Sequence, residues 1–172
     1  GPRRMSGAAA FRERLAWDAE AGAILDQARR YMMIRPDALM GALASLPEPC
    51  RAVAFSALEA SVFQQGSDSA RAYAAMGGGG EALLATVAAT APQLGWGVWR
   101  VSQGPGRILL AVRNSPFAAA CPPGMPYAVC TPIQGMLRAV AGMVFGRPAH
   151  VTETECVALG QAECRFVAEI AG

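Results

Sequence analysis

Lysine is absent from this sequence, and all 15 of its basic residues are arginine. The net charge of +2 over 172 residues is too small to indicate a nucleic-acid partner. Apolar residues make up 53% of the chain, yet no uninterrupted apolar run reaches the roughly 18 residues expected of a membrane span. The N-terminus is arginine-rich but lacks the apolar segment of a secretion signal. We therefore expect a cytoplasmic protein with a sizeable core.

Two nucleotide-binding motifs are also missing. The run Gly77 to Gly80 is not followed by Lys-Ser or Lys-Thr, so it lacks the side chains of a phosphate-binding loop. No Gly-x-Gly-x-x-Gly follows a strand pattern, and no flavin motif is visible. The glycine run is therefore interpreted as a flexible joint between two helices.

Five cysteines, an odd number without a secretion signal, indicate free thiols in a reducing compartment. Cys156 and Cys164 flank a glycine-containing turn in a predicted hairpin, and Cys130 begins a predicted helix. Zinc prefers thiolate ligands, and a carboxylate can complete a tetrahedral structural site. The alternative is that these cysteines are small buried apolar residues, which free cysteine commonly is.

Two glutamates lie close enough in the sequence to supply a fourth ligand. Glu153 and Cys156 are three positions apart, so a regular strand would turn them to opposite faces. A bulge or the start of the turn must rotate one of them if both bind one metal. Strand periodicity alone does not choose between Glu153 and Glu155. Cys121, in a proline-rich loop, is a weaker candidate ligand.

The spacing of apolar residues predicts helices in the first half of the chain, and strands with one further helix in the second. The predicted helices cover 18–33, 37–46, 51–65, a segment from Ser67 or Asp68 to Met76, 81–91 and 130–145. Two predicted hairpins pair 95–102 with 107–114, and 149–156 with 163–170. We expect an α+β fold: an antiparallel sheet of about four strands, with helices packed on one face and an N-terminal helical layer. Residues 1–17 are expected to form a flexible arm, and residues 18–172 a single domain.

The segment from Asn114 to Ile170 resembles the 4-vinyl reductase domain family. The resemblance rests on an Asn-Ser-Pro-Phe run, a Pro-Tyr-Ala-Val-Cys entry to a helix, a Glu-x2-Cys pair, a turn glycine and a final Cys-x-Phe. In this sequence the pattern falls on 114–117, Cys130, Glu153, Cys156, Gly160, Cys164 and Phe166. The resemblance implies a structural zinc ion held by Cys130, Glu153, Cys156 and Cys164.

The family includes proteins of bacteriochlorophyll biosynthesis, which this sequence resembles most, and sensor domains of phenol- and xylene-responsive activators. The resemblance implies binding of a tetrapyrrole, a chlorophyllide or Mg-porphyrin precursor. Because no motif for a nicotinamide or flavin is present, we expect an accessory or carrier protein that presents the intermediate to other pathway enzymes. Two alternatives stay open: a 4-vinyl (8-vinyl) reductase with an external reductant, and a small-molecule sensor domain.

The candidate ligand pocket lies between the first hairpin and the helices. Trp96 and Trp99 offer flat apolar surfaces to a macrocycle, although aromatic residues on strands are usually packing. Arg100 and Arg113 are candidates for meeting a propionate group. The only histidine, His150, is a candidate for a magnesium ligand, for a residue behind the zinc ligands, or for an exposed strand residue. The sensor relatives pair through N-terminal elements, so a homodimer is expected.

Overall fold

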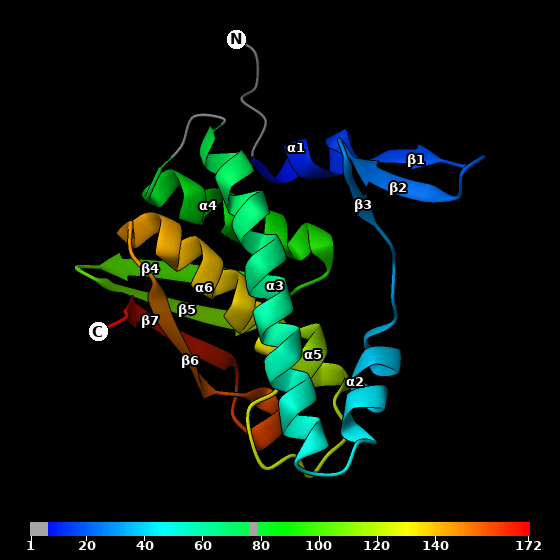
Figure 1. Ribbon diagram of the computed structural model, residues 1–172, viewed down its shortest axis with the longest axis vertical. Coiled ribbons are helices and arrows are strands. Elements are labelled where there is room, and N and C mark those ends of the chain that lie inside the picture. Colours follow the sequence, from blue (N-terminus) through cyan, green and yellow to red (C-terminus); the bar gives the residue numbers. More distant parts are fainter. Residues whose placement is uncertain (1–6, 76–78) are drawn as a thin grey trace.

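The computed structural model describes residues 7–75 and 79–172 (Figure 1). Its α-helices are α1 (Gly7–Arg14), α2 (Pro36–Ala44), α3 (Cys50–Ala75), α4 (Glu81–Thr90), α5 (Pro116–Ala120) and α6 (Thr131–Phe145). Its strands are β1 (Ala16–Asp18), β2 (Ala23–Asp26), β3 (Arg29–Tyr31), β4 (Val98–Gly104), β5 (Arg107–Arg113), β6 (Ala149–Glu155) and β7 (Cys164–Ile170). Short 3-10 turns, η1 (Ala91–Leu94) and η2 (Val157–Leu159), follow α4 and β6.

The larger sheet has four strands in the order β4-β5-β7-β6, and every neighbouring pair is antiparallel. Both predicted hairpins are present, and the pairing of β5 with β7 joins them. Side chains alternate along each strand, so that Ile108, Leu110 and Val112 on β5 and Phe166 on β7 are buried on one face. The expected α+β class with a four-stranded antiparallel sheet is confirmed.

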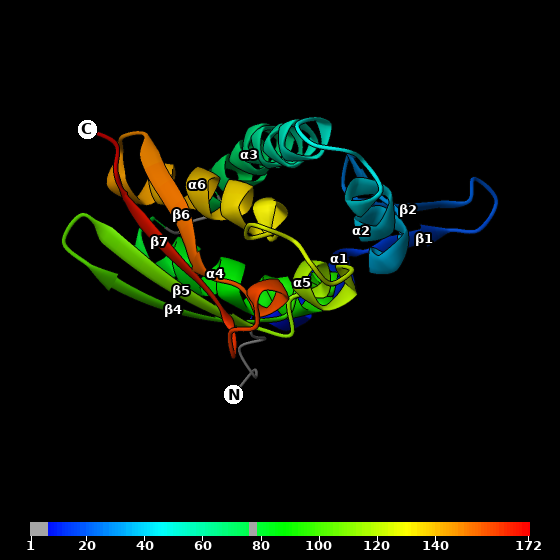
Figure 2. The ribbon, with the colours of Figure 1, turned by 90° about the horizontal axis from the view of Figure 1, so that it is seen from below.

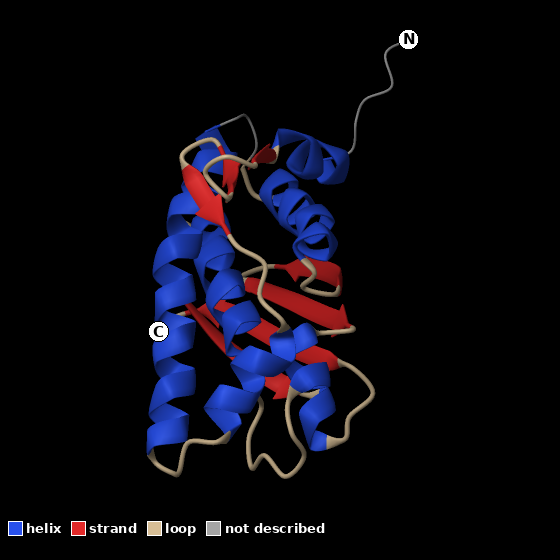
Figure 3. Ribbon diagram, turned by 90° about the vertical axis from the view of Figure 1, so that its right-hand side faces the viewer, coloured by secondary structure: helices blue, strands red, loops and turns tan. Residues whose placement is uncertain are grey.

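Helices α6 and α3 cover the apolar face of this sheet in two successive layers (Figures 2 and 3). Gly135 lets the two helices approach closely, because a Cβ there would overlap the carbonyl of Glu59. Arg138 on α6 stacks on Phe63 of α3, with its guanidinium carbon 3.8 Å from the ring centroid. The core therefore lies between the sheet and α6, as expected from helices on one face.

The helix predicted over residues 18–33 is wrong, since this segment forms the antiparallel strands β1, β2 and β3. Two residues with positive φ, Gly22 at 62° and Gln27 at 56°, turn the chain where a helix would have to continue. The apolar residues at helical spacing also fit a sheet, in which Ile24 pairs with Tyr31. This small sheet shares no strand with the larger one and projects from the rest of the fold (Figure 1).

The two helices predicted on either side of residue 66 form one continuous helix, α3, so the predicted break is wrong. Ser67 does not cap a new helix, because its hydroxyl donates to the Phe63 carbonyl one turn back, at 2.8 Å. Gly66 is buried, and a Cβ there would crowd Met136 on α6. Residues 76–78, which include half of the predicted glycine joint, lie outside the described residues.

The first hairpin also begins later than predicted, at Val98 instead of residue 95. Gly95 and Gly97 have φ values of 77° and 85°, which place both outside a strand. A Cβ on Gly97 would overlap the Arg113 carbonyl, so this close approach requires glycine. None of the described helices combines the length and apolar character needed to cross a bilayer.

Candidate functional site

Four side chains with metal-binding groups meet beside the start of α6. They come from the N-cap of α6 (Cys130), from β6 (Glu153), from the residue after it (Cys156) and from the first residue of β7 (Cys164). Their ligand atoms, three sulfurs and one carboxylate oxygen, all lie within 4.8 Å of one another. The three cysteines are fully buried. This group could hold a metal ion, and Cys121 is not part of it.

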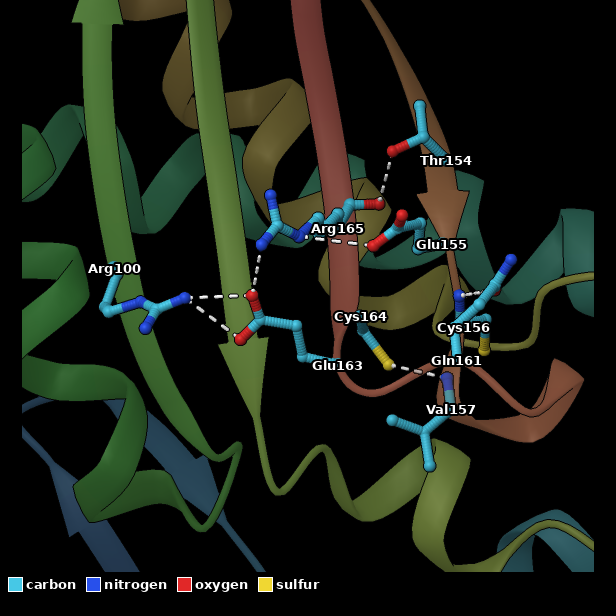
Figure 4. Close-up of polar contacts among 9 residues, drawn as sticks. All are labelled: Arg100, Thr154, Glu155, Cys156, Val157, Gln161, Glu163, Cys164 and Arg165. Atoms are coloured by element: carbon cyan, nitrogen blue, oxygen red, sulfur yellow. Dashed lines mark hydrogen bonds and ion pairs between the residues drawn. The ribbon is translucent and has the colours of Figure 1, made fainter.

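A bulge in β6 decides which glutamate joins the cysteines. Glu153 pairs with Phe166 and Glu155 with Arg165, so Thr154 is an extra residue between neighbouring pairs. Glu153 therefore turns toward the cysteines, whereas Glu155 pairs with the Arg165 guanidinium at 3.2 Å (Figure 4). The bulge expected from the three-residue spacing is confirmed, and the choice that periodicity left open falls on Glu153.

The contacts within the cluster leave one carboxylate oxygen without a partner. The Cys130 backbone N–H donates to Glu153 Oε1 at 2.9 Å. The sulfurs of Cys130 and Cys164 lie 3.6 Å apart. The Val157 N–H approaches the Cys164 sulfur at 3.4 Å (Figure 4). Glu153 Oε2 is buried and has no hydrogen-bond donor. A cation among the four groups would satisfy this oxygen, so the residues present fit a metal.

The electrostatics of the cluster also favour a cation. Burial, followed by the charge of Cys156, raises the pKa of Glu153 to about 8. Hydrogen bonds to Cys156 and Cys164, and then burial, raise the pKa of Cys130 far above that of an ordinary thiol. Four acidic groups at these distances cannot all be ionised without a counter-ion. A divalent cation would lower their pKa values together, because it stabilises every deprotonated ligand.

Two residues that the ligand pattern did not single out hold the ligands in position. The side-chain oxygen of Gln161 accepts the Cys156 N–H at 2.6 Å across the turn (Figure 4). The Ser115 hydroxyl caps α5 by accepting the Ala118 N–H and lies 3.1 Å from the Cys130 sulfur. Ser115 falls within the Asn-Ser-Pro-Phe run, so the sequence marked its position, whereas nothing in the sequence marked Gln161.

A cavity of about 60 Å³ lies on the apolar side of the larger sheet. Its lining residues come from helices, sheet and N-terminal segment alike: Phe11, Tyr31, Ser69, Ala70, Tyr73, Val87, Thr90, Ala91, Leu94, Trp96, Trp99, Met136 and Val140. Trp99 donates its indole N–H to the Trp96 carbonyl at 3.0 Å. The Trp96 ring packs edge-on against Phe117, with centroids 5.3 Å apart. Both tryptophans named from the sequence therefore line a cavity.

The two arginines predicted for the same pocket lie elsewhere, since neither Arg100 nor Arg113 lines the cavity. Arg100 contacts both carboxylate oxygens of Glu163, at 2.9 and 3.0 Å, on the solvent face of the sheet (Figure 4). Arg113 is exposed at the end of β5. His150 is also exposed, with a ring nitrogen 3.3 Å from the Thr152 hydroxyl, as one interpretation of the sequence expected.

Comparison with solved structures shows the same fold in proteins of distant sequence. The phenol-responsive sensory domain of the transcription activator PoxR, in a crystal structure with phenol, has a TM-score of 0.80 at 18% identity, over 95% of this chain and 88% of that chain. A trafficking protein particle complex subunit 3 from Naegleria fowleri, covalently bound to palmitic acid, has a TM-score of 0.57 at 14% identity, over 80% and 95%. A vinyl-4-reductase family protein from Methanocaldococcus jannaschii has a TM-score of 0.51 at 15% identity, over 83% and 98%.

Comparison of the sequence with protein families finds a match in only one part of the chain. No curated protein matches the sequence. Residues 109–170 match the V4R domain family, and this stretch contains most of β5, then α5, α6 and the closing hairpin. All four cluster residues fall inside it. The likeness to the V4R domain family thus covers the C-terminal part of the chain, from residue 109 to residue 170.

Proposed function

We propose that this chain is a small-molecule-binding domain, with the cavity as its ligand site and a structural zinc ion at the cysteine cluster. The observation that carries the proposal is the cavity of about 60 Å³, on which apolar and aromatic side chains from separate elements converge. A concave, mostly apolar space with a few polar groups is the usual form of a small-ligand site.

The lining of the cavity sets the chemistry of the ligand. Among the described residues no charged side chain lines it, so an ionic ligand would lose its hydration without compensation. Tyr31, Ser69 and Tyr73 supply hydroxyl groups for one or two hydrogen bonds. The flexible side chain of Met136 lets the wall adjust to a ring. The PoxR sensory domain, which has the same fold and was seen with phenol, supports a small uncharged aromatic ligand.

Zinc is the ion that we propose for the cluster. Three thiolates and one carboxylate form a tetrahedral donor set of the kind that zinc takes in structural sites. With Cys130, Glu153, Cys156 and Cys164 all bound, no coordination position is left for water or substrate, so the site has no catalytic role. Cys130 would tie the start of α6 to the β6–β7 hairpin. The ion supplies a cross-link and neutralises the ligand charge.

The prediction of a tetrapyrrole carrier in bacteriochlorophyll biosynthesis is the competing proposal. Pockets for drug-sized ligands occupy roughly 300 Å³ or more, and a chlorophyllide is larger than such ligands. The cavity, at about 60 Å³, would have to widen several-fold to admit the macrocycle. A vinyl reductase would in addition need a reductant from a partner. The volume therefore favours the sensor-type alternative over the carrier and the reductase.

Titration of the chain with phenol, benzoate and divinyl chlorophyllide distinguishes these functions. Trp17 is 65% exposed and lies outside the cavity, so a Trp17→Phe variant leaves emission from Trp96 and Trp99 alone. We expect phenol to change this emission and to raise the melting temperature. Benzoate is the matched control, because its charge should exclude it at the same concentration.

Three outcomes would contradict the proposal. Chlorophyllide binding without any response to phenol would favour the carrier, and NADPH-dependent turnover of the vinyl group would favour the reductase. If no single-ring neutral aromatic changes either the emission or the melting temperature, the cavity is a packing defect and not a ligand site.

A homodimer remains part of the proposal because of the apolar surface near the N-terminus. Trp17, Met32 and Met33 are 65%, 78% and 80% exposed, respectively. Trp17 lies on β1, and Met32 and Met33 directly follow β3, so all three belong to the small sheet or its exit, where exposed apolar side chains would suit an association surface. A second copy of the chain would cover them. Light scattering at micromolar concentration should give the dimer mass, and a monomer mass would contradict the proposal.

A further inference from the structure

Two separate parts of the chain build the wall of the cavity. Most of the lining belongs to α3, α4, η1, β4 and α6, which we call the body. Phe11 on α1 and Tyr31 at the end of β3 complete the wall, and their rings meet edge-on with centroids 5.8 Å apart. We call residues 7–31, from α1 to β3, the cap; in Figure 1 it lies beside the C-terminal end of α3.

A buried carboxylate organises the cap and links it to the body. Asp26 is fully buried and accepts from Arg14 Nε at 3.2 Å and from Arg29 Nη2 at 3.3 Å. Arg14 Nη2 also donates to the Tyr73 hydroxyl on α3 at 3.3 Å. Its guanidinium carbon lies over the rings of Phe11 and Tyr73, 5.7 and 5.8 Å from their centroids. Arg14 therefore joins the ion pairs of the cap to a cavity-lining residue of the body.

The fold makes the cap a peripheral unit. Its three-stranded sheet has no pairing with the four-stranded sheet. A further polar contact with the body, from the Arg12 backbone N–H to Gln93 Oε1 at 3.0 Å, is exposed. No cap residue belongs to the metal-binding cluster. The cap otherwise touches the body mainly through α1, which packs on α4 and η1, and a peripheral segment of this kind opens at a lower free energy than the core.

We propose that ligand occupancy and docking of the cap are coupled, so that the ligand closes the cap and the docked cap retains the ligand. The inference rests on the proposed function of the cavity. A ligand in the cavity touches Phe11 and Tyr31 on one side and the body on the other, so its full set of contacts exists only in the docked state. Any molecule that binds only one of two states shifts the equilibrium toward that state, and the coupling is reciprocal.

Hydrogen exchange on the whole chain, with phenol as the probe, tests the coupling. Phenol at ten times its dissociation constant should slow exchange of the amides at 11–31 by about tenfold, because opening must await release of the ligand. Amides of β5 that exchange through global unfolding should slow by a similar factor and so report that phenol is bound. Slowing in β5 with unchanged exchange in the cap would overturn the coupling and leave the proposed function intact. Unchanged exchange in both regions would overturn both.

A pair of variants on one helix turn tests the link through Arg14. Arg14→Gln removes the contacts with Asp26 and Tyr73, whereas Arg12→Gln removes the same charge from an exposed side chain. We expect cap amides to exchange about tenfold faster in Arg14→Gln without ligand, as loss of a charge-assisted hydrogen bond implies, and phenol to restore protection. Arg12→Gln should match the original chain. Equal exchange in the two variants would overturn the role of Arg14.

A milder variant keeps the test decisive if Arg14→Gln does not fold. Tyr73→Phe removes only the hydroxyl that accepts from Arg14 and keeps the ring that lines the cavity. We expect faster exchange at 11–31, with unchanged metal content and unchanged exchange at 149–170. Faster exchange across the whole chain would mean a general loss of stability and would count against a separately opening cap.

Discussion

The metal cluster and the cap each surround one buried acidic group, but they satisfy it in different ways. In the cluster, Glu153 has an oxygen without a donor, and its neighbours are thiols that are themselves acidic. In the cap, Asp26 accepts from the guanidinium groups of Arg14 and Arg29. A buried acid that the protein leaves unsatisfied marks a place for a cation, whereas one that arginines satisfy is a joint between elements.

The pKa values of the two acids shift in opposite directions for this reason. Burial acts to raise both. For Glu153 the charge of Cys156 adds to burial and the pKa rises to about 8. For Asp26 burial is outweighed by hydrogen bonds from Arg14 and Arg29, which hold the pKa below its ordinary value. A metal would therefore stabilise the cluster, whereas the cap is stabilised by its own charges.

The largest expected effect is loss of the metal. Cys164→Ser should abolish zinc binding and lower the free energy of unfolding by about 4 kcal/mol or more, since a structural zinc contributes directly to folding. Elemental analysis and denaturant unfolding measure the two quantities. Cys50→Ser is the control, because Cys50 is exposed and outside the cluster. A metal-free chain in which Cys164→Ser has no effect would show that the cysteines are ordinary core residues.

A second pair of variants tests which of the two glutamates on either side of the bulge binds the metal. Glu153→Gln should weaken zinc binding by about 10- to 100-fold, because a neutral amide replaces the carboxylate ligand. Glu155→Gln, which loses only its surface pair with Arg165, should bind zinc normally and change stability by less than about 0.5 kcal/mol. Competition with a chelator measures the affinities. Equal affinities in the two variants would contradict the assignment of Glu153 as a ligand.

In the cap, Asp26→Asn should lower the free energy of opening of residues 11–31 by about 1–2 kcal/mol. The effect is intermediate because both arginine partners are partly exposed. Asp18→Asn, whose carboxylate accepts the exposed Ala21 N–H, is the control. The lowered pKa of Asp26 means that its contribution is complete above about pH 4 and is lost as the pH falls through the folded-state value. Hydrogen exchange of the cap amides at acidic and neutral pH measures this contribution. Equal exchange rates in Asp26→Asn and Asp18→Asn would contradict the prediction.

The smallest expected effect lies on the solvent face of the sheet. Arg100→Ala removes the contacts with Glu163 and should change the free energy of unfolding by less than about 0.5 kcal/mol. Ligand binding should not change, because Arg100 does not line the cavity. A loss of porphyrin or phenol affinity in this variant, measured by fluorescence, would restore the original prediction that Arg100 contacts a ligand.

The cluster was predictable from sequence because its geometry needs particular residue types at particular spacings. The cysteines follow from their type and spacing, but only the family resemblance singled out Glu153 over Glu155 as the fourth ligand. The three-residue gap before Cys156 required a bulge or the start of a turn, and the structure has the bulge. The cap was not predictable, because Ile24 and Tyr31 suit a helix and a sheet equally and the chain turns at Gln27, a residue that does not favour positive φ. The cavity was not predictable either, because it depends on contacts between residues far apart in the sequence. Arg14 and Tyr73, for example, are 59 positions apart.

Helix α6 has a candidate metal ligand at its start and lines the cavity farther along. Cys130 caps the helix, while Met136 and Val140 line the cavity about 9 and 15 Å away along the axis, at about 1.5 Å per residue. A helix behaves nearly as a rigid rod over this length, so any axial slip or rotation at its start is transmitted to both side chains. The bound ion would thus fix the position of the cavity wall without touching the cavity. Loss of the ion would then change which aromatic ring the cavity admits, even in a domain that is still folded.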